Sequence, residues 1–168
     1  TDIATWHCND MVVGAEGTAY VGNFGFDIES DRSNPVAAAL AIVQPDGTAT
    51  AGPTELDFPN GSVITPDGST LIVGETFGSR MTAFQILEGG LLGNPRVWAE
   101  TPGIRPDGCC LDEAGGIWVA DAGGGDLRLH VTHHQVGNPD VVAQDMPDGH
   151  HLFALFIKLD SLELQAFG

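Results

Sequence analysis

Hydrophobic and polar positions follow the same arrangement three times along the chain. Three nine-residue segments, 9–17, 60–68 and 107–115, align without a gap, and each starts with Asn or Asp and has a glycine eight residues later. A large apolar residue follows eleven positions after each leader, and a branched one comes next. Short apolar runs separated by glycine turns are typical of β-hairpins. Each segment therefore predicts a strand, a tight turn and a second strand.

The segments between these hairpins have strand-like pieces of their own, such as 41–43 and 81–84, punctuated by turn residues. The leaders are 51 and 47 residues apart. A period near 50 with about four short strands is the signature of a β-propeller blade. We therefore predict an all-β fold, a single partial propeller domain over residues 1–168. Its blade repeats start near 9, 60 and 107, and a divergent tail starts at about 150.

The number of blades that fit in the sequence is too small for a typical closed propeller. At this period the 168 residues hold about three and a half blades, whereas closed propellers usually have four to eight. An unclosed array leaves sheet edges and blade faces exposed. We expect either further residues upstream or self-association with a second copy that closes the ring.

The amino-acid composition and net charge limit the kinds of molecule that the protein is expected to bind. The 23 glycines and 10 prolines favour turns, and 23 acidic against 6 basic residues give a net charge of −17. Such a surface repels phosphate backbones and anionic membranes, so neither nucleic acid nor membrane is an expected partner. An acidic surface attracts cations, although the excess of acidic residues is also explained by solubility alone. No apolar run approaches a membrane span, and the odd set Cys8, Cys109 and Cys110 fits a reducing compartment, so we expect a cytoplasmic protein.

The three leaders Asn9, Asn60 and Asp107 are the first candidate site. The innermost strand of every propeller blade runs beside the central axis, so equivalent residues of the repeat converge on one place. Amide and carboxylate oxygens are the donors that hard divalent cations prefer. The alternative is purely structural, because Asn and Asp commonly begin strands, and Asn60-Gly61 and Asp107-Gly108 are turn dipeptides.

Several segments together resemble the gluconolactonase/senescence-marker-protein-30 (SMP-30) family. They are HCND (7–10), AYVGNFGFD (19–27), PNG (59–61), PDG (66–68), GET (74–76), PDG (106–108) and GIWVA (116–120). The resemblance covers about residues 5–128. It implies a six-bladed propeller that hydrolyses sugar lactones with one divalent cation in its central channel: calcium, magnesium, manganese or zinc.

The same resemblance implies roles for individual residues. Asn60 and Asp107 resemble two of the family's metal ligands, and Asp107 also resembles the general base that activates water. Asn9 resembles an asparagine that lines the substrate site, and His7 stands where the family usually has an arginine. The third protein ligand of the family is a glutamate of the first blade, and no residue from Thr1 onward matches it.

Other motifs are weaker. His130, His133 and His134, with His150 and His151, lack the context of a zinc motif, and we interpret them as strand or loop histidines. The run 123–126 lacks the lysine of a phosphate loop and favours a turn. Cys109 and Cys110 have no identifiable histidine partner and are better interpreted as small buried residues.

Two functions follow from the sequence. The first is a metal-dependent hydrolase that opens a small-molecule sugar lactone. The alternative is a catalytically inactive propeller fragment or binding scaffold, because a fold does not fix a function.

Overall fold

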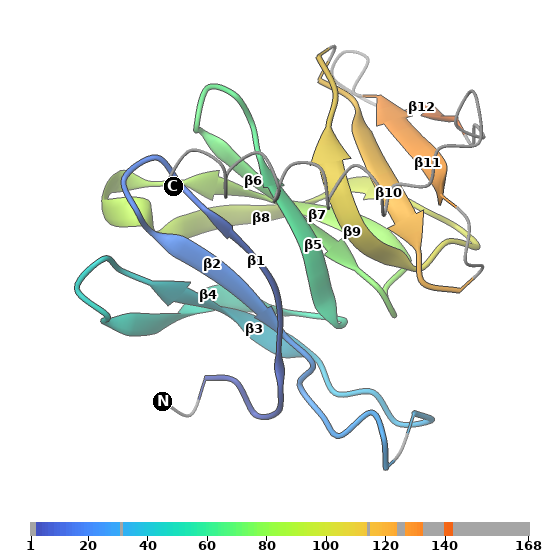
Figure 1. Cartoon of the computed structure of the whole chain (residues 1–168), viewed down its shortest axis with the longest axis horizontal. Helices are drawn as coiled ribbons and strands as arrows, with labels where there is room; N and C mark the ends of the chain where they lie inside the picture. Colours follow the sequence, from blue (N-terminus) through green and yellow to red (C-terminus); the bar gives the residue numbers. More distant parts are fainter. Residues whose placement is uncertain (1–2, 31, 114, 124–126, 133–139, 143–168) are drawn as a thin grey trace, which may run out of the picture.

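The structure, a computed structural model, describes residues 3–30, 32–113, 115–123, 127–132 and 140–142, the last two ranges as backbone only. The strands form three four-stranded antiparallel sheets, each a meander in chain order (Figure 1). The first sheet has β1 (Cys8–Val13), β2 (Ala19–Asn23), β3 (Ala38–Val43) and β4 (Ala49–Leu56). The middle sheet has β5 (Pro59–Ile64), β6 (Thr70–Glu75), β7 (Arg80–Ile86) and β8 (Leu92–Glu100), with the short 3-10 helix η1 (Glu88–Gly90) before β8. The third sheet has β9 (Pro106–Leu111), β10 (Ile117–Asp121), β11 (Leu127–Thr132) and β12 (Asp140–Val142). The all-β prediction is confirmed.

The first strands of the three sheets lie next to one another, β1 beside β5 and β5 beside β9 (Figure 1). Each sheet continues away from this row in chain order. Glycines allow the close approach. A Cβ atom on Gly61 of β5 would lie 2.2 Å from the carbonyl oxygen of Asp107, and one on Gly22 of β2 would lie 2.5 Å from that of Pro59. No side chain fits at either position unless the backbone moves.

Two apolar cores hold the sheets together. The core between the first and middle sheets is formed by Tyr20, Leu40, Ile42, Leu56, Leu71, Val73, Phe84 and Leu92. The core between the middle and third sheets is formed by Val63, Ile72, Met81, Ala83, Trp98, Ala99, Cys109, Ile117 and Val119. Neighbouring residues of β6 alternate between the two cores, as a strand buried on both faces requires.

The glycines predicted to form the hairpin turns adopt positive φ: 86° at Gly17, 72° at Gly68 and 84° at Gly115. The turns differ in length, however. The first closes with a hydrogen bond from Gly14 N to Thr18 O (2.9 Å), whereas the middle one spans one residue more, from Thr65 N to Thr70 O (2.9 Å). The gap-free repeat is therefore offset by one residue in the second strand of the middle sheet.

Several residues for which the sequence raised an expectation lie outside the described part of the chain. Residues 124–126, His133, His134, His150, His151 and the tail from about 150 lie outside the described residues. His130 is in β11, where only the backbone is described. Within the described part of the chain, no helix is long and apolar enough to cross a membrane.

Candidate functional site

Two of the three predicted leaders meet directly at the start of the innermost strands. Asn60, in β5, is buried, with 5% of its surface exposed. Its side-chain Nδ2 donates a hydrogen bond of 2.8 Å to Oδ1 of Asp107, in β9, although 47 residues separate them in the chain. The neighbouring positions of β5 and β9 bring a carboxylate and an amide of adjacent sheets into one place.

Thr76 fixes the orientation of the Asn60 side chain. Its Oγ1 accepts a second bond from Asn60 Nδ2 at 3.1 Å and donates to the carbonyl oxygen of Pro106 at 2.6 Å. Thr76 thus connects the strand that carries Asn60 to the residue before Asp107. With the Asn60 nitrogen engaged by both neighbours, the carbonyl oxygen Oδ1 is the atom of that side chain suited to a cation.

The first sheet contributes Asn9 and Asp10. Asn9 Nδ2 donates to the carbonyl oxygen of Pro59 at 3.2 Å, which attaches the third leader to β5 beside Asn60. Asp10 is exposed as a residue, yet neighbouring atoms partly shield its carboxyl group from water. That shielding, together with the negative charge of Asp107, raises the pKa of Asp10. A second carboxylate therefore lies within electrostatic reach of Asp107.

Neither Asp10 nor Thr76 was predicted from the sequence as part of this site. In the repeat, Asp10 corresponds to Gly61 and Gly108, so only the first sheet has a side chain at that position. This difference between the three repeat units was the feature of the sequence that could have identified Asp10. Thr76 directly follows β6, and nothing in its spacing distinguishes it from other threonines.

His7 lies in an aromatic cluster. Its ring is 5.0 Å from that of Trp6 and 6.1 Å from that of Phe24. The cluster continues from Phe24 to Phe58 (4.7 Å) and from Phe58 to Phe77 (5.0 Å). Because Phe58 and Phe77 are two and one residues from Asn60 and Thr76, these rings form a wall at the same end of the strands.

Glu75, at the end of β6, anchors the segment that leads into Asn60. It is fully buried, and its carboxylate accepts two bonds of 2.8 Å from Arg80, one from the backbone nitrogen of Asp57 (2.8 Å) and a short one from Thr82. Burial alone raises the pKa of Glu75, but these hydrogen bonds and the charge of Arg80 outweigh it and hold that pKa below its ordinary value. Glu75 is therefore a buried ionised group with a structural role.

Cys109 and Cys110 do not have the environment of reactive thiols. Cys109 is buried in the core between the middle and third sheets. Burial, with the nearby Cys110 and Asp10, strongly raises the pKa of the Cys109 thiol, and burial followed by Asp112 raises that of Cys110. Reactive thiols need a lowered pKa.

The donor set fits a hard divalent cation. Among the described residues, no three His, Cys, Asp or Glu side chains gather into a metal cluster. The group that does gather combines the oxygens of Asn60 and Asp107 with Asp10 nearby, and oxygen donors suit calcium, magnesium or manganese better than softer metals. A cation there would also relieve the repulsion between the carboxylates of Asp10 and Asp107.

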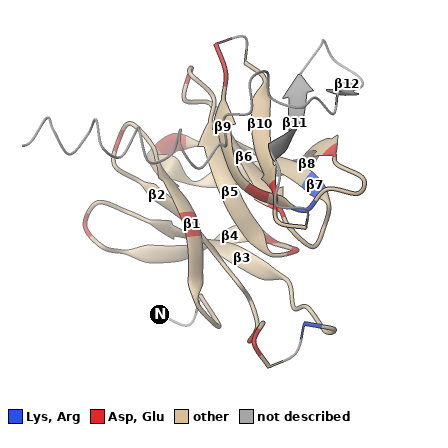
Figure 2. Cartoon of the chain, turned by 45° about the vertical axis from the view of Figure 1, so that its right-hand side comes forward, with Lys and Arg blue, Asp and Glu red and all other residues tan. Residues whose placement is uncertain are grey.

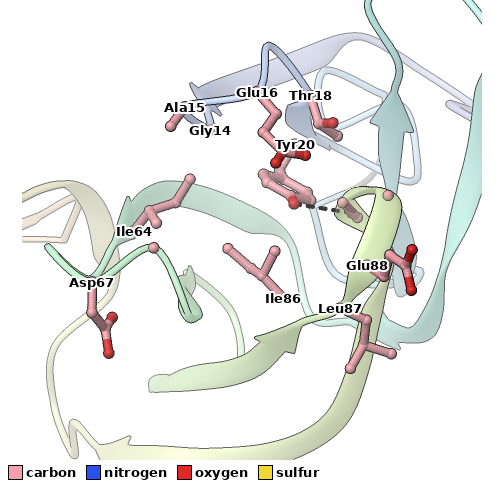
Figure 3. A pocket seen from close by; sticks show the side chains of 13 residues that line it. Gly14, Ala15, Glu16, Thr18, Tyr20, Ile64, Asp67, Ile86, Leu87 and Glu88 are labelled. Carbon is pink, nitrogen blue, oxygen red and sulfur yellow. Dashed lines mark hydrogen bonds between the residues drawn. The ribbon is translucent and has the colours of Figure 1, made fainter.

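A cavity of about 380 Å³ lies at the other end of β1 and β5, between their hairpin turns and the turn after β7 (Figure 3). Glu16, Asp67 and Glu88 lie along it, and the Tyr20 hydroxyl donates to the carbonyl oxygen of Gly90 at 2.9 Å. None of the predicted site residues lines this cavity, so it is distinct from the strand-end site.

Comparison with solved structures supports the propeller prediction. A gluconolactonase from Xanthomonas campestris, described as important in glucose secondary metabolic pathways, is 26% identical with a TM-score of 0.61, over 82% of this chain and 47% of that one. Regucalcin from Agrobacterium tumefaciens, described as a calcium-binding protein, is 24% identical with a TM-score of 0.60, over 86% and 43%. A luciferin-regenerating enzyme is 20% identical with a TM-score of 0.68, over 82% and 46%. The chain thus spans less than half the length of each.

These structures confirm a partial β-propeller in which each of the three sheets is a blade. The family resemblance is confirmed as well. The sequence profile of the SMP-30/Gluconolactonase/LRE-like region matches residues 2–147, most of the chain. This chain belongs to the SMP-30/gluconolactonase/LRE-like family.

Proposed function

We propose that the chain carries the cation-binding part of a site that hydrolyses small sugar lactones. The observation that carries this proposal is the 2.8 Å hydrogen bond between Asn60 and Asp107, because it joins two oxygen-bearing side chains of adjacent blades. The 26% sequence identity with the Xanthomonas gluconolactonase supports lactone hydrolysis as the class of reaction. The choice of a divalent cation rests on the oxygen donors.

Asn60 and Asp107 would hold the cation through their side-chain oxygens. When bound, the cation supplies Lewis-acid stabilisation of the negative charge that develops on the lactone carbonyl oxygen. Asp107 would position the attacking water and accept its proton as general base. A carboxylate that binds a cation is a weaker base, so these two roles compete in Asp107, and Asp10 adds a second carboxylate beside it.

Substrate hydroxyl groups need partners that donate and accept hydrogen bonds. We assign that role to Asn9, whose amide already lies against β5, and to His7 in the adjoining aromatic wall. The apolar face of a sugar ring packs well on aromatic side chains, which makes Phe24 and Trp6 suitable neighbours.

The second candidate is a cation-binding scaffold without turnover. It is favoured by one observation: among the described residues, no three His, Cys, Asp or Glu side chains gather at this site. A cation held by few protein ligands can bind without the further groups that the reaction needs.

Calorimetric titration with calcium, magnesium, manganese and zinc separates these candidates. We expect saturable binding of one cation that Asp107→Asn weakens at least tenfold, about 1.4 kcal/mol. Asp46→Asn is the matched control, because it removes the same charge from a different place. Asp46 lies in the exposed turn between β3 and β4. Equal losses in both variants would mean that only the overall acidity attracts cations.

Gluconolactone hydrolysis is then measured on the same samples by acid release. Cation-dependent turnover that is lost in Asp107→Asn and kept in Asp46→Asn supports the lactonase. Site-specific binding without turnover supports the scaffold, and absence of binding by every cation contradicts both.

A further inference from the structure

Phe58, in the bend between β4 and β5, has a backbone conformation that aromatic residues rarely adopt. Its φ is 65°, in the left-handed region that favours glycine. The next residue is Pro59, and a proline restricts the residue before it to extended conformations. The local sequence therefore opposes this conformation in two ways, and contacts with other parts of the structure must hold it.

Neighbouring rings and backbone groups fix Phe58 in place. Its side chain is buried, and its ring lies 4.7 Å from that of Phe24 and 5.0 Å from that of Phe77. Its backbone nitrogen donates to the carbonyl oxygen of Leu56 at 3.0 Å, and its carbonyl oxygen accepts from the backbone nitrogen of Thr76 at 3.1 Å. A strained backbone conformation persists only when the surrounding structure determines it in this way.

The ring of Phe24 comes from the first sheet, where Phe24 directly follows β2. The backbone nitrogen of Phe24 donates to the carbonyl oxygen of His7, just before β1, at 3.0 Å. Strand β1 in turn lies beside β5 (Figure 2). The contact between Phe24 and Phe58 therefore connects the strand end that carries Asn9 with the strand end that carries Asn60.

The other two sheets form the same corner without a left-handed residue. In the repeat, His7 and Arg105 correspond to Phe58, each two residues before a leader. Their carbonyl oxygens accept the equivalent bonds, from the backbone nitrogen of Phe24 at 3.0 Å and from that of Ala122 at 2.9 Å. Neither His7 nor Arg105, both within the described residues, has a positive φ. This hydrogen bond therefore does not require a left-handed residue, and the conformation of Phe58 is particular to the middle sheet.

Asn60 lies where the pairing of β5 with β6 is irregular. The register shifts within 59–62, where two residues of β5, Asn60 and Gly61, oppose one residue of β6. Such a bulge interrupts the ladder, so contacts outside the ladder orient the side chain. One of these contacts is Thr76, whose Oγ1 accepts from Asn60 Nδ2 at 3.1 Å. The backbone nitrogen of Thr76 donates to Phe58, so the same residue connects Phe58 and Asn60.

We propose that Phe58 is a positioning residue for the cation site. The neighbouring rings hold its backbone in the left-handed conformation, and this conformation directs the chain into β5 so that the Asn60 side chain meets Asp107. With an extended Phe58, the carbonyl oxygen would turn away from Thr76, and the support of the Asn60 amide would be lost. The role toward the cation rests on the function proposed above, whereas the orientation of Asn60 is a property of the protein alone.

NMR spectra of the cation-free protein report the orientation of Asn60 through its side-chain amide signals. Asn60→Asp removes these signals and thereby assigns them. Phe58→Ala should move them towards the values of an unbonded amide, because alanine lacks the ring and disfavours positive φ. Phe58→Gly also lacks the ring but accepts positive φ without cost, so its Asn60 signals should stay closer to those of the wild type.

Calorimetric titration with calcium measures the effect on the cation site. Phe58→Ala should weaken binding about tenfold or more, and Phe58→Gly should bind about fivefold more tightly than Phe58→Ala. A role in packing alone predicts the reverse order, because glycine makes the unfolded chain more flexible. Leu40→Ala is the matched control, since Leu40 is buried in the core between the same two sheets. It should lower the melting temperature without moving the Asn60 signals.

Asn60 signals that are the same in Phe58→Ala and in the wild type would overturn the proposal. Equal effects of alanine and glycine would also overturn it, because the backbone conformation would then play no part. If Phe58→Ala does not fold, Phe24→Leu tests the same contact from the first sheet and should move the Asn60 signals in the same direction. A wild-type protein that binds no calcium contradicts the proposed function, whereas the NMR comparison still decides the role of Phe58.

Discussion

Replacement of Gly61 by alanine introduces one methyl group where two innermost strands come closest. The new Cβ would lie 2.2 Å from the carbonyl oxygen of Asp107, 2.7 Å from the backbone nitrogen of Cys109 and 2.8 Å from the carbonyl carbon of Gly108. All three are backbone atoms of β9, so no side-chain rotation relieves the clash. β5 and β9 must separate by about 1 Å to reach ordinary contact distances.

The size of the effect follows from what that separation disrupts. Overpacking a tight interior position commonly costs about 1–3 kcal/mol. We expect the upper end, about 3 kcal/mol, because backbone must move and the core containing Cys109 moves with it. A shift of this size also lengthens the 2.8 Å contact between Asn60 and Asp107, so cation binding should weaken at least tenfold.

Urea denaturation measures the stability change, and calorimetric titration measures cation affinity. Gly52→Ala is the control: it is also a strand glycine, but its added Cβ would meet Leu40 at 3.5 Å, an ordinary contact. Alanine there should change stability by less than about 1 kcal/mol. If Gly61→Ala behaves like Gly52→Ala in both assays, close packing of β5 on β9 does not hold the site.

Two other substitutions test the supports of the site. Glu75→Gln removes the charge that pairs with Arg80 and should lower the free energy of unfolding by about 2–4 kcal/mol in urea denaturation at pH 7. Because the folded pKa of Glu75 lies below its ordinary value of 4.5, its contribution is present above pH 4.5 and is lost as pH falls through the folded pKa. The variant should lack this part of the acid-induced loss; an unchanged pH profile would refute the assignment. Thr76→Val keeps the shape of the side chain but leaves the Pro106 carbonyl oxygen without its donor, at a cost of about 1–3 kcal/mol. It should also weaken cation binding in calorimetry, and wild-type affinity would show that Thr76 does not orient Asn60.

The sequence predicted the sheets and the proximity of Asn60 and Asp107 because the repeat fixes both. Asn60 and Asp107 occupy the same position of successive units, so adjacent placement of the units brings them into contact. The one-residue offset in the middle sheet was not predictable in the same way. Leu71 and Ile72 are both large and apolar, so sliding the strand by one residue leaves the pattern unchanged.

The buried polar groups around the site could not be predicted from the repeat. Glu75 and Arg80 face each other across the turn between β6 and β7, and the equivalent of Glu75 in the first sheet is Asn23, which bonds to the backbone oxygen of Ala39 at 2.8 Å. Each sheet thus satisfies this corner with a different polar residue. Only the three-dimensional pairing tells a structural carboxylate from a catalytic one.

Strands β6 and β3 have similar hydrophobic patterns but differ in how many of their faces are packed against other sheets. In β6, Leu71, Ile72 and Val73 are all apolar and all buried, because sheets pack on both sides. In β3, the run from Ala38 to Val43 is equally apolar, yet only alternate residues are buried. The other residues of β3 are half-buried, as on a strand that has a neighbouring sheet on one side among the described residues. An apolar sequence therefore does not by itself say how many faces of a strand are packed, and only the arrangement of the sheets separates β3 from β6.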